Sequence, residues 1–554
     1  MPRAVELLKQ GRNEELWQMC CGYLKFSLEQ FMAVQERLLL EQISLLNQCA
    51  LGRKVMRGAS PQTVAEFRRQ VPLTTYADYC PDLPEKREDI LPAMTSQWVH
   101  TSGKSGEYPC KWVPISQHYA NALSTINYGV GMIAGSRYWG DMAGITGCPR
   151  IVYTVAPRPY MSGALAAMTQ EQAPARYLPP LDESEGMPFQ DRLQLGFKQA
   201  LSQGMDYFFG LSLVLVSVGN RFSQNTEKMS IRPYLSQPRA LLRLTRGVIK
   251  SKLAGRAMLP RDLWSLKGIM CGGLDSAIYR EKIKELWGRY PLDVYGSTEG
   301  GVIATQIWDY HGMAFIPNLN FLEFIPEDEH LKSRINPGYQ PATVLLDEVQ
   351  AGKIYEIVIT NFHGGAMVRY RIGDMVRIVS LKNEETGMDV PQMAFERRAD
   401  DLLDFVVIRL TEKRIWQAVE NTGFPYEDWT AYKEKGSAVL NMLIEPRNGC
   451  YLDEVELAQA IHRQIMKADW DEYSLSQIHD DLADMISFRV RVTQLPTGAF
   501  ARYTTQKQAE GADLAHLKPP HISPSPEVLS ILLSKPRIVP AVSVPADREK
   551  VVIS

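Results

Sequence analysis

GKIYEIVITNFHGGAMVRYRIGDMVRIVS, spanning Gly352–Ser380, consists of apolar and β-branched runs separated by glycine and other turn residues. Such runs predict the strands of a small antiparallel sheet or barrel. Upstream, short apolar runs such as RIVYTVA near Ile151 and KGIMCGG near Ile269 alternate with helical patterns, as is typical of α/β folds. We therefore predict an α/β protein whose large N-terminal domain carries a β-barrel-like subdomain over about residues 318–399.

A new series of helices and strands begins after ERRADDLLDF, residues Glu396–Phe405. A helix follows, then the strand SAVLNMLIE, a helix over 452–467 and the strand MISFRVRVTQ. That order predicts a small, mobile α+β domain over residues 400–554, joined by a hinge near Asp400 to a large domain over residues 1–399.

Two further segments carry local expectations. The longest apolar run, GLSLVLVSVG from Gly210 to Gly219, is about half the ~20 residues of a membrane-spanning helix, so we predict a buried strand and no membrane span. The segment from Gln170 to Pro188 is rich in proline and acidic residues and predicts a surface loop.

The charge balance of the chain argues against a polyanion-binding protein. With 61 basic and 63 acidic residues spread fairly evenly, the net charge is −2. A nucleic-acid or anionic-membrane surface needs clustered lysine and arginine, and we therefore expect no nucleic-acid partner. The N-terminus lacks the pattern of a secretory signal, and the eight cysteines form no C-x-x-C pair, so we expect reduced cysteines and a cytoplasmic location.

A loop of small residues, TSGKSGEYPCKWVP, runs from Thr101 to Pro114. Glycine and hydroxylated residues let backbone N–H groups close around phosphate oxygens. The triplet Gly-Lys-Ser does not make a Walker A motif, because Trp98 stands where that motif needs glycine. The candidate phosphate-binding residues are Thr101, Ser102, Gly103, Lys104 and Ser105. The alternative is that the loop is an ordinary surface turn.

Two glycine-containing turns follow strand-like segments. In CGGLDS, from Cys271, a strand–glycine–helix order permits a flat ligand to lie against the backbone at Gly272 and Gly273. In YGSTEGG, Tyr295 can stack on a base and Glu299 can bind Mg²⁺, which prefers carboxylate and phosphate oxygens. The alternatives are a plain strand-to-helix turn and a glutamate that caps the next helix. The candidate ligand-binding residues of the second turn are Tyr295, Gly296, Ser297, Thr298 and Glu299.

A third acidic turn lies in VRYRIGDMVRIV, residues Val368–Val379. Asp374 follows a glycine between two predicted strands, where its carboxylate can accept two hydrogen bonds from ribose hydroxyls. Alternatively, Asp374 can satisfy local N–H groups as a turn residue.

The order of these motifs, ending with R-x-D-D at Arg398–Asp401, resembles the adenylate-forming superfamily of acyl-CoA synthetases, luciferases and peptide-synthetase adenylation domains. The closer resemblance is to its GH3 branch of acyl acid-amido synthetases, through VPLTTYADYCPDL, TSGKSGEYPCKWVP, YGSTEGG, GKIYEIVITNFHGGAMVRYRIGDMVRIV, LPTGAFARY and HLKPPHI. Lys104 replaces the usual threonine, one extra residue precedes Lys111, and YGSTE replaces Y-A-S-S-E. These departures favour a bacterial-type member.

The resemblance implies a role for each candidate residue. The loop Ser102–Ser105 would hold the β- and γ-phosphates of ATP, Thr298 the α-phosphate and Glu299 the Mg²⁺. By the same resemblance, Gly273 and Tyr295 would contact adenine, and Asp374 and Arg398 would contact the ribose. Lys518 of HLKPPHI would contact the reacting carboxylate. Lys518 can equally be a solvated surface lysine beside Pro519.

The reaction that this resemblance implies is activation of a small carboxylic acid as its acyl-adenylate, then transfer of the acyl group to an amino acid amine. An acid–thiol ligase that uses coenzyme A is an alternative on the same fold. A nucleotide-binding scaffold without catalysis is a third, and the acidic residues Glu299 and Asp374 together with Lys518 count against it.

Overall fold

The computed structural model describes the following residues: 4–101, 110–145, 147–154, 156–225, 237–272, 276–336, 338–399, 403–405, 409–434, 438–447, 450, 453–467, 488–509 and 519–534. The chain forms two compact units, the first within Met1–Thr411 and the second containing Glu412–Ala468 and the chain from Phe488. The hinge predicted near Asp400 stays a prediction, because Asp400 lies outside the described residues. Among the described residues, no helix has both the length and the apolar character needed to cross a bilayer.

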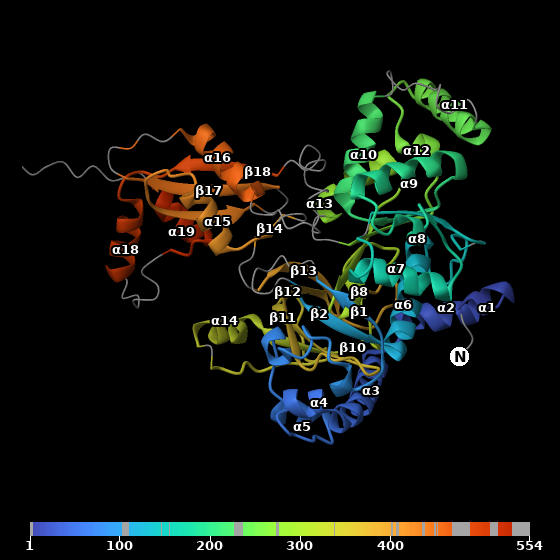
Figure 1. Ribbon diagram of the computed structural model, residues 1–554, viewed down its shortest axis with the longest axis horizontal. Coiled ribbons are helices and arrows are strands. Elements are labelled where there is room, and N and C mark those ends of the chain that lie inside the picture. The colour runs from blue at the N-terminus through green and yellow to red at the C-terminus, as the bar shows by residue number, and fades with distance from the viewer. Residues whose placement is uncertain are drawn as a thin grey trace, which may run out of the picture. The chain divides into compact units, whose positions relative to one another are not determined.

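The first unit opens with helices, of which α3, α4 and α5 lie below the labelled strands in the view of Figure 1. The amphipathic pattern at 14–56 predicts one or two long helices, and the structure has α2, α3 and α4 there. Ser27 caps α3 through a capping box with Gln30, which fixes where this helix begins. The opening helices are α1 (Ala4–Lys9), α2 (Asn13–Cys21), α3 (Leu28–Gln48), α4 (Ala50–Val55) and α5 (Val64–Gln70), with short 3-10 turns at Gly22–Lys25, Tyr76–Tyr79 and Glu88–Ile90.

An 11-stranded sheet forms the body of this unit, in the order β10-β11-β12-β13-β9-β8-β7-β6-β5-β3-β4. Strands β4, β3, β5, β6 and β7 pair in parallel, and the rest pair antiparallel. The parallel strands are β3 (Arg150–Tyr153), β4 (Arg176–Leu178), β5 (Tyr207–Gly210), β6 (Gly268–Gly272) and β7 (Leu292–Ser297). The antiparallel strands are β8 (Gly301–Thr305), β9 (Met313–Phe315), β10 (Asn320–Pro326), β11 (Ile354–Asn361), β12 (Tyr370–Ser380) and β13 (Gln392–Arg398).

The parallel half of the sheet is buried on both faces. Tyr207 and Met270 belong to the core on one face, whereas Phe208 and Ile269 belong to a second core on the other. This alternation is what a strand covered by helices on both sides requires. The helices of this half are α6 (Gln117–Gly135), α7 (Met161–Gln172), α8 (Leu181–Ser184), α9 (Phe189–Gln203), α10 (Ser212–Asn225), α11 (Pro238–Leu253), α12 (Pro260–Leu263) and α13 (Ser276–Trp287).

The β-rich run predicted over 318–399 forms β10 to β13, with α14 (Glu327–Ile335) between β10 and β11. These strands continue the parallel half, because β13 pairs with β9 at Met393 and Met313. Two small hairpins complete the unit: β1 (Thr95–His100) with β2 (Trp112–Ser116), and β14 (Leu403–Asp404) with β15 (Arg409–Leu410).

Two local predictions are wrong. The apolar run from Gly210 to Gly219 is not a strand, because β5 ends at Gly210 and helix α10 begins at Ser212. Short apolar runs do not distinguish a buried strand from a buried helix, and here the run packs on α13, where a Cβ at Gly219 would lie 2.6 Å from Leu286. The predicted loop Gln170–Pro188 contains strand β4, which pairs with β3, and helix α8.

The second unit is an α+β fold around a three-stranded sheet in the order β16-β17-β18. Strands β16 and β17 are antiparallel, and β17 and β18 are parallel. The predicted strands at SAVLNMLIE and MISFRVRVTQ and the helix near 452–467 are confirmed as β17, β18 and α16. The elements are α15 (Glu412–Glu420), β16 (Tyr426–Lys433), β17 (Val439–Pro446), α16 (Glu454–Lys467), β18 (Arg489–Gln494), α18 (Ala499–Ala509) and α19 (Pro526–Leu533).

Candidate functional site

A cavity of about 870 Å³ opens where the parallel strands of the first unit end. Leu211 and Gly272 line it from the ends of β5 and β6, and Tyr295 lines it from β7. Asp374 and Arg398 close it from β12 and β13. Ligands of open α/β sheets bind at the carboxyl ends of the strands, so this is the expected edge for a ligand.

Two motifs exchange tyrosine–carboxylate hydrogen bonds beside this cavity. The Tyr295 hydroxyl donates to Oδ2 of Asp374 at 2.8 Å. The Tyr370 hydroxyl donates to Oε1 of Glu299 at 3.1 Å. Each tyrosine stands four residues before the acid of its own motif and binds the acid of the other. The two motifs, which are far apart in the sequence, therefore form one reciprocal unit.

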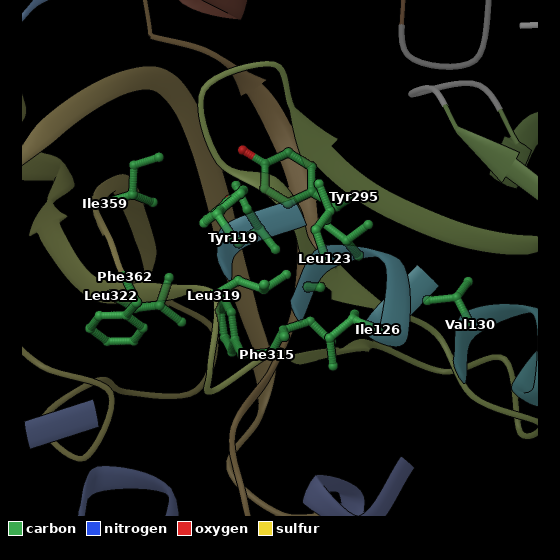
Figure 2. Close-up of a cluster of buried hydrophobic side chains, with 14 of the residues drawn as sticks. Tyr119, Leu123, Ile126, Val130, Tyr295, Phe315, Leu319, Leu322, Ile359 and Phe362 are labelled. Carbon is green, nitrogen blue, oxygen red and sulfur yellow. The ribbon is translucent and has the colours of Figure 1, made fainter. Parts of the chain in front are cut away.

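This exchange depends on the curvature of the sheet, because β13, β9 and β8 lie between β12 and β7 in the strand order. Helix α6 packs against the turn between β7 and β8 that carries Glu299. Its Ser116 cap binds the N–H of Tyr119, and the Tyr119 hydroxyl and Leu123 leave no room for a Cβ at Gly301, directly after the Glu299 turn. Figure 2 shows Tyr119 and Leu123 in the apolar cluster that also includes Tyr295.

Tyr295 and Arg398 hold the Asp374 carboxylate in a fixed orientation. Nη1 of Arg398 lies 2.5 Å from Oδ1, and the two residues face each other in the β12–β13 register. Gly373 has φ +78°, and Nη2 of Arg398 lies 3.2 Å from where its Cβ would be, so glycine suits this turn for two reasons. A carboxylate has about four acceptor positions, so Asp374 can still accept hydrogen bonds from a ligand.

The two tyrosines act as donors because they stay protonated. Burial, with the Asp374 carboxylate beside it, raises the pKa of Tyr295 well above its usual range. Burial and the Glu299 carboxylate raise the pKa of Tyr370 in the same way. Neither hydroxyl titrates near neutral pH, and both keep the carboxylates oriented.

Lys111 adds a cation to the Glu299 side of the unit. Its Nζ lies 3.3 Å from the Tyr370 hydroxyl and 3.9 Å from Oε1 of Glu299. Its backbone closes the β1–β2 loop, because the Lys111 N–H donates to Oγ1 of Thr101 and the Thr101 N–H donates to the Lys111 carbonyl. The Lys111 side chain, at the base of the predicted phosphate loop, therefore reaches Glu299.

The predicted site residues divide into three groups. The cavity lining includes Gly272, Tyr295, Gly296, Asp374 and Arg398. Ser297 accepts from the Gly300 N–H, and Thr298 and Glu299 follow in the same turn, with Thr101 at the base of the β1–β2 loop. The remaining candidates lie outside the described residues: Ser102, Gly103, Lys104, Ser105, Gly273 and Lys518.

Sequence reasoning assigned no role to Tyr370 or Lys111. The signal for Tyr370 was present, since it precedes Asp374 by the same four residues that separate Tyr295 from Glu299. Lys111 could not be found in this way, because its proximity to Glu299 arises only from tertiary packing.

Glu299 has the chemistry of a ligand for Mg²⁺ carried by a phosphate substrate. Its side chain is buried, and Tyr370 and Lys111 both approach Oε1. Within the part of the chain that the structure describes, no cluster of three or more His, Cys, Asp or Glu residues is found. One carboxylate suits Mg²⁺ that is also bound by phosphate oxygens, and does not by itself make a resident metal centre.

A smaller apolar pocket of about 60 Å³ lies on the α6 face of the same strands. Phe209 and Met270 line it, two residues before Leu211 and Gly272 of the cavity lining, so the pocket and the cavity follow one another along β5 and β6. Its fifteen lining residues, all described, include no charged side chain. Its polar groups include Asn127 and Thr169, which hydrogen-bond to each other at 2.9 Å.

In the second unit, His521 anchors the segment that follows Lys518. Its ring nitrogens lie 2.7 Å from Glu412 and 2.8 Å from Asp428, and the ring stacks on Trp429 at 4.5 Å. Burial lowers the pKa of His521, but the hydrogen bonds to Asp428 and Glu412 outweigh it, so the pKa is raised. The segment beginning at Pro519 is thereby fixed to α15 and β16.

Comparison with known structures identifies the fold. An acyl acid amido synthetase, AtGH3.15, in complex with 2,4-DB superposes with a TM-score of 0.51 at 16% identity, over 96% of this chain and 97% of that one. A 2-hydroxyisobutyryl-CoA ligase in complex with 2-HIB-AMP and CoA gives 0.51 at 15% identity, over 85% and 87%. The chain therefore has the mixed α/β fold of adenylate-forming enzymes, which confirms the predicted fold class.

Sequence comparison identifies relatives over part of the chain. A jasmonoyl–L-amino acid synthetase of Nicotiana attenuata is 36% identical over 162 residues, which are 28% of this chain and 25% of that protein. A 4-substituted benzoates–glutamate ligase of Arabidopsis thaliana is 30% identical over 156 residues, 26% of this chain and 24% of that protein. The matching part thus spans about a quarter of the length of these curated relatives.

Two domains of one family also match in consecutive order. Residues 23–156 match the GH3 family N-terminal domain, and residues 313–398 match the GH3 family central domain. The first contains the β1–β2 loop, and the second contains Tyr370, Asp374 and Arg398. The half of the reciprocal unit contributed by β12 thus lies in the second match, and the half at Tyr295 and Glu299 lies between the two matches. Over these two segments the chain is similar to the GH3 family.

Proposed function

We propose that this protein is an ATP-dependent ligase that activates a small carboxylic acid as its acyl-adenylate and then transfers the acyl group to an amino acid amine. The observation that carries this proposal is the reciprocal pairing of Tyr295 with Asp374 and of Tyr370 with Glu299. It holds the Asp374 carboxylate at the cavity and the Glu299 carboxylate beside Lys111 at the base of the predicted phosphate loop, where the two could serve the ribose and the triphosphate of one ATP.

In the first step, a carboxylate oxygen of the acid attacks the α-phosphorus of ATP, and the bond to pyrophosphate breaks. Negative charge gathers on the phosphorus oxygens, so cations and N–H donors placed beforehand lower the barrier. Asp374, oriented by Arg398 and Tyr295, would accept from the ribose hydroxyls. Lys111 supplies a cation at the base of the phosphate loop, and Glu299 would hold Mg²⁺, which neutralises phosphate charge when bound.

The remaining assignments extend the same proposal to the rest of the predicted site. A Cβ at Gly272 would meet nothing within 4 Å, so this glycine leaves space for a flat base in the cavity. The loop Ser102–Ser105 would contact the β- and γ-phosphates, and Thr298 the α-phosphate. Lys518, beyond a hinge near Asp400 and preceding the anchored segment at Pro519, would approach the reacting carboxylate from the small domain.

The apolar pocket is the proposed place for the acyl group. Because no charged residue lines it, the pocket suits an apolar or aromatic monocarboxylate and disfavours an acid with a second charge. Gly131 on α6 lines this pocket, and a Cβ there would meet only Sδ of Met270, at 3.8 Å. A glycine inside a helix destabilises the fold by about 0.5–1 kcal/mol relative to alanine. Because no close contact excludes a Cβ at Gly131, the space that glycine leaves in the pocket is the reason that fits.

All eight cysteines are free thiols, which supports the proposal that the reaction takes place in the reducing cytoplasm.

A screen of candidate substrates tests which acceptor receives the acyl group. Purified protein is screened for acid-dependent pyrophosphate release, and the screen is repeated with amino acids and with coenzyme A. Release that depends on an acid, with amide product from an amino acid, supports the proposal, whereas product only with coenzyme A assigns the acid–thiol reaction.

The nucleotide site is tested with Asp374→Ala. We expect the dissociation constants of ATP and AMP to rise and that of inorganic triphosphate to stay, because each charge-assisted bond to a ribose hydroxyl contributes about 1.5–3 kcal/mol. Asp206→Ala is the matched control: Asp206 is buried to a similar degree and pairs with Arg150 at 2.7 Å, but lies at the amino end of β5. Equal weakening of all three ligands by Asp374→Ala would refute the ribose assignment.

A further inference from the structure

Helix α11 carries an unusual charge for a protein whose basic and acidic residues balance. Its sequence, PRALLRLTRGVIKSKL, contains five lysine and arginine residues and no acidic residue. One face is used in the fold, because Ala240, Leu244, Gly247 and Ser251 are buried. A Cβ at Gly247 would lie 2.5 Å from Leu263, which shows how closely α11 packs on α12 (Figure 1).

The opposite face exposes a narrow apolar stripe. Leu242 is 52% exposed, Ile249 53% and Leu253 84%. At about 100° per residue, these three positions lie within roughly 40° of one another around the helix. Their side chains therefore form one row along the helix and point away from its buried face.

Basic side chains flank this row on both sides. Arg239, Arg246 and Lys250 follow it on one side, and Lys252 lies on the other, by the same helical spacing. All four are exposed, and none forms an ion pair with any residue that the structure describes. Arg243 differs, because it turns inward and donates to the backbone carbonyls of Ala200 and Leu201.

We propose that α11 binds the surface of a lipid bilayer that contains anionic lipids. A helix with a central apolar row and cations on both flanks lies in the plane of such a surface. Its apolar side chains enter the boundary between headgroups and acyl chains, and its cations meet the lipid phosphates. Leu242, Ile249 and Leu253 supply the first contact, and the flanking arginine and lysine residues supply the second.

The form of the stripe favours a bilayer over the other partners of a basic helix. A stable protein–protein interface buries about 800 Å² on each partner, which is more than a row one side chain wide provides. A nucleic acid would pair with the cations but leave the leucine and isoleucine side chains in water. The expectation that the chain presents no anionic-membrane surface rested on its even charge balance, and α11 concentrates charge that this balance conceals.

The test uses the full-length protein and co-sedimentation with vesicles of phosphatidylcholine, alone or mixed with phosphatidylserine. We expect binding to the mixed vesicles only, weakened by salt. Replacing the row by Leu242→Gln, Ile249→Gln and Leu253→Gln together should reduce binding by on the order of tenfold or more, because each apolar side chain leaves the bilayer. Arg246→Gln with Lys250→Gln should reduce it about fivefold per charge.

Helix α14 provides a matched control. It exposes Leu331 and Ile335 as α11 exposes its row, but its first turn carries three acidic residues. The double variant Leu331→Gln and Ile335→Gln should bind mixed vesicles as the wild type does. Circular dichroism of every variant shows whether the fold is kept, which is expected because the changed side chains are exposed.

Several outcomes would overturn the proposal. These are no binding of the wild type to mixed vesicles, equal binding to phosphatidylcholine alone, or unchanged binding of the triple α11 variant. If sedimentation velocity shows a wild-type dimer that the triple variant loses, without vesicle binding, the row is a contact between two copies. Binding to duplex DNA that survives in the triple variant, again without vesicle binding, would assign the cations to a nucleic acid.

Discussion

The reciprocal unit predicts that its two tyrosines have separable functions. Tyr295→Phe removes one hydrogen bond, to Oδ2 of Asp374 at 2.8 Å, and leaves the buried ring in place. A hydrogen bond to a charged group contributes about 1.5–3 kcal/mol. Arg398 still holds the other oxygen at 2.5 Å, so we expect the lower end, about 1.5 kcal/mol. The dissociation constants of ATP and AMP should therefore rise about tenfold.

Tyr370→Phe is the complementary change, because it releases Oε1 of Glu299. We expect a lower rate of pyrophosphate release at saturating ATP and Mg²⁺, with a smaller change in ATP affinity. Glu299→Gln should show the same kind of defect in larger degree, since a neutral amide is a poor ligand for Mg²⁺. A helix-capping glutamate would tolerate the amide and keep its turnover.

The assay measures binding of ATP, AMP and inorganic triphosphate by calorimetry, and pyrophosphate release under saturating conditions. Triphosphate binding should be unchanged in Tyr295→Phe, because triphosphate has no ribose. If Tyr295→Phe weakens triphosphate as much as ATP, or if both tyrosine variants show one identical defect, the two halves are not separable. The reasoning from the reciprocal pairs would then be refuted.

Three further results are expected. Lys518→Ala should slow adenylation but spare acyl transfer from a pre-made acyl-adenylate, since the cation is needed only while charge builds on the α-phosphate. An equal loss of rate in both half-reactions would contradict this role of Lys518. Gly131→Ala should raise stability by about 0.5–1 kcal/mol in thermal or denaturant unfolding while narrowing the accepted acids to smaller ones, and an unchanged acid range would exclude this pocket as the acyl site. For His521, whose pKa is raised by Asp428 and Glu412, the stabilisation is full below the unfolded pKa of about 6.5 and is lost as pH rises through the folded pKa. His521→Gln should remove this pH dependence from the unfolding of the second unit.

Part of the candidate site could be predicted from short motifs. Asp374 and Tyr295 were assigned to ligand binding from glycine-containing turns, and both line the cavity. Such turns are local, so sequence neighbours decide their geometry. The partners of these residues could not be predicted, because Tyr370 reaches Glu299 only where the sheet curves back across three strands.

The sequence by itself determined the fold class, the order of the motifs and the main elements of the second unit, because periodicity and turn residues act over a few positions. Only the tertiary structure decided the state of the apolar run at Gly210–Gly219, which forms part of a helix because it packs against α13. It also decided which face of α11 is buried and which is exposed. The basic and apolar residues of that helix are visible in the sequence, but their exposure depends on contacts with α12 that spacing alone does not specify.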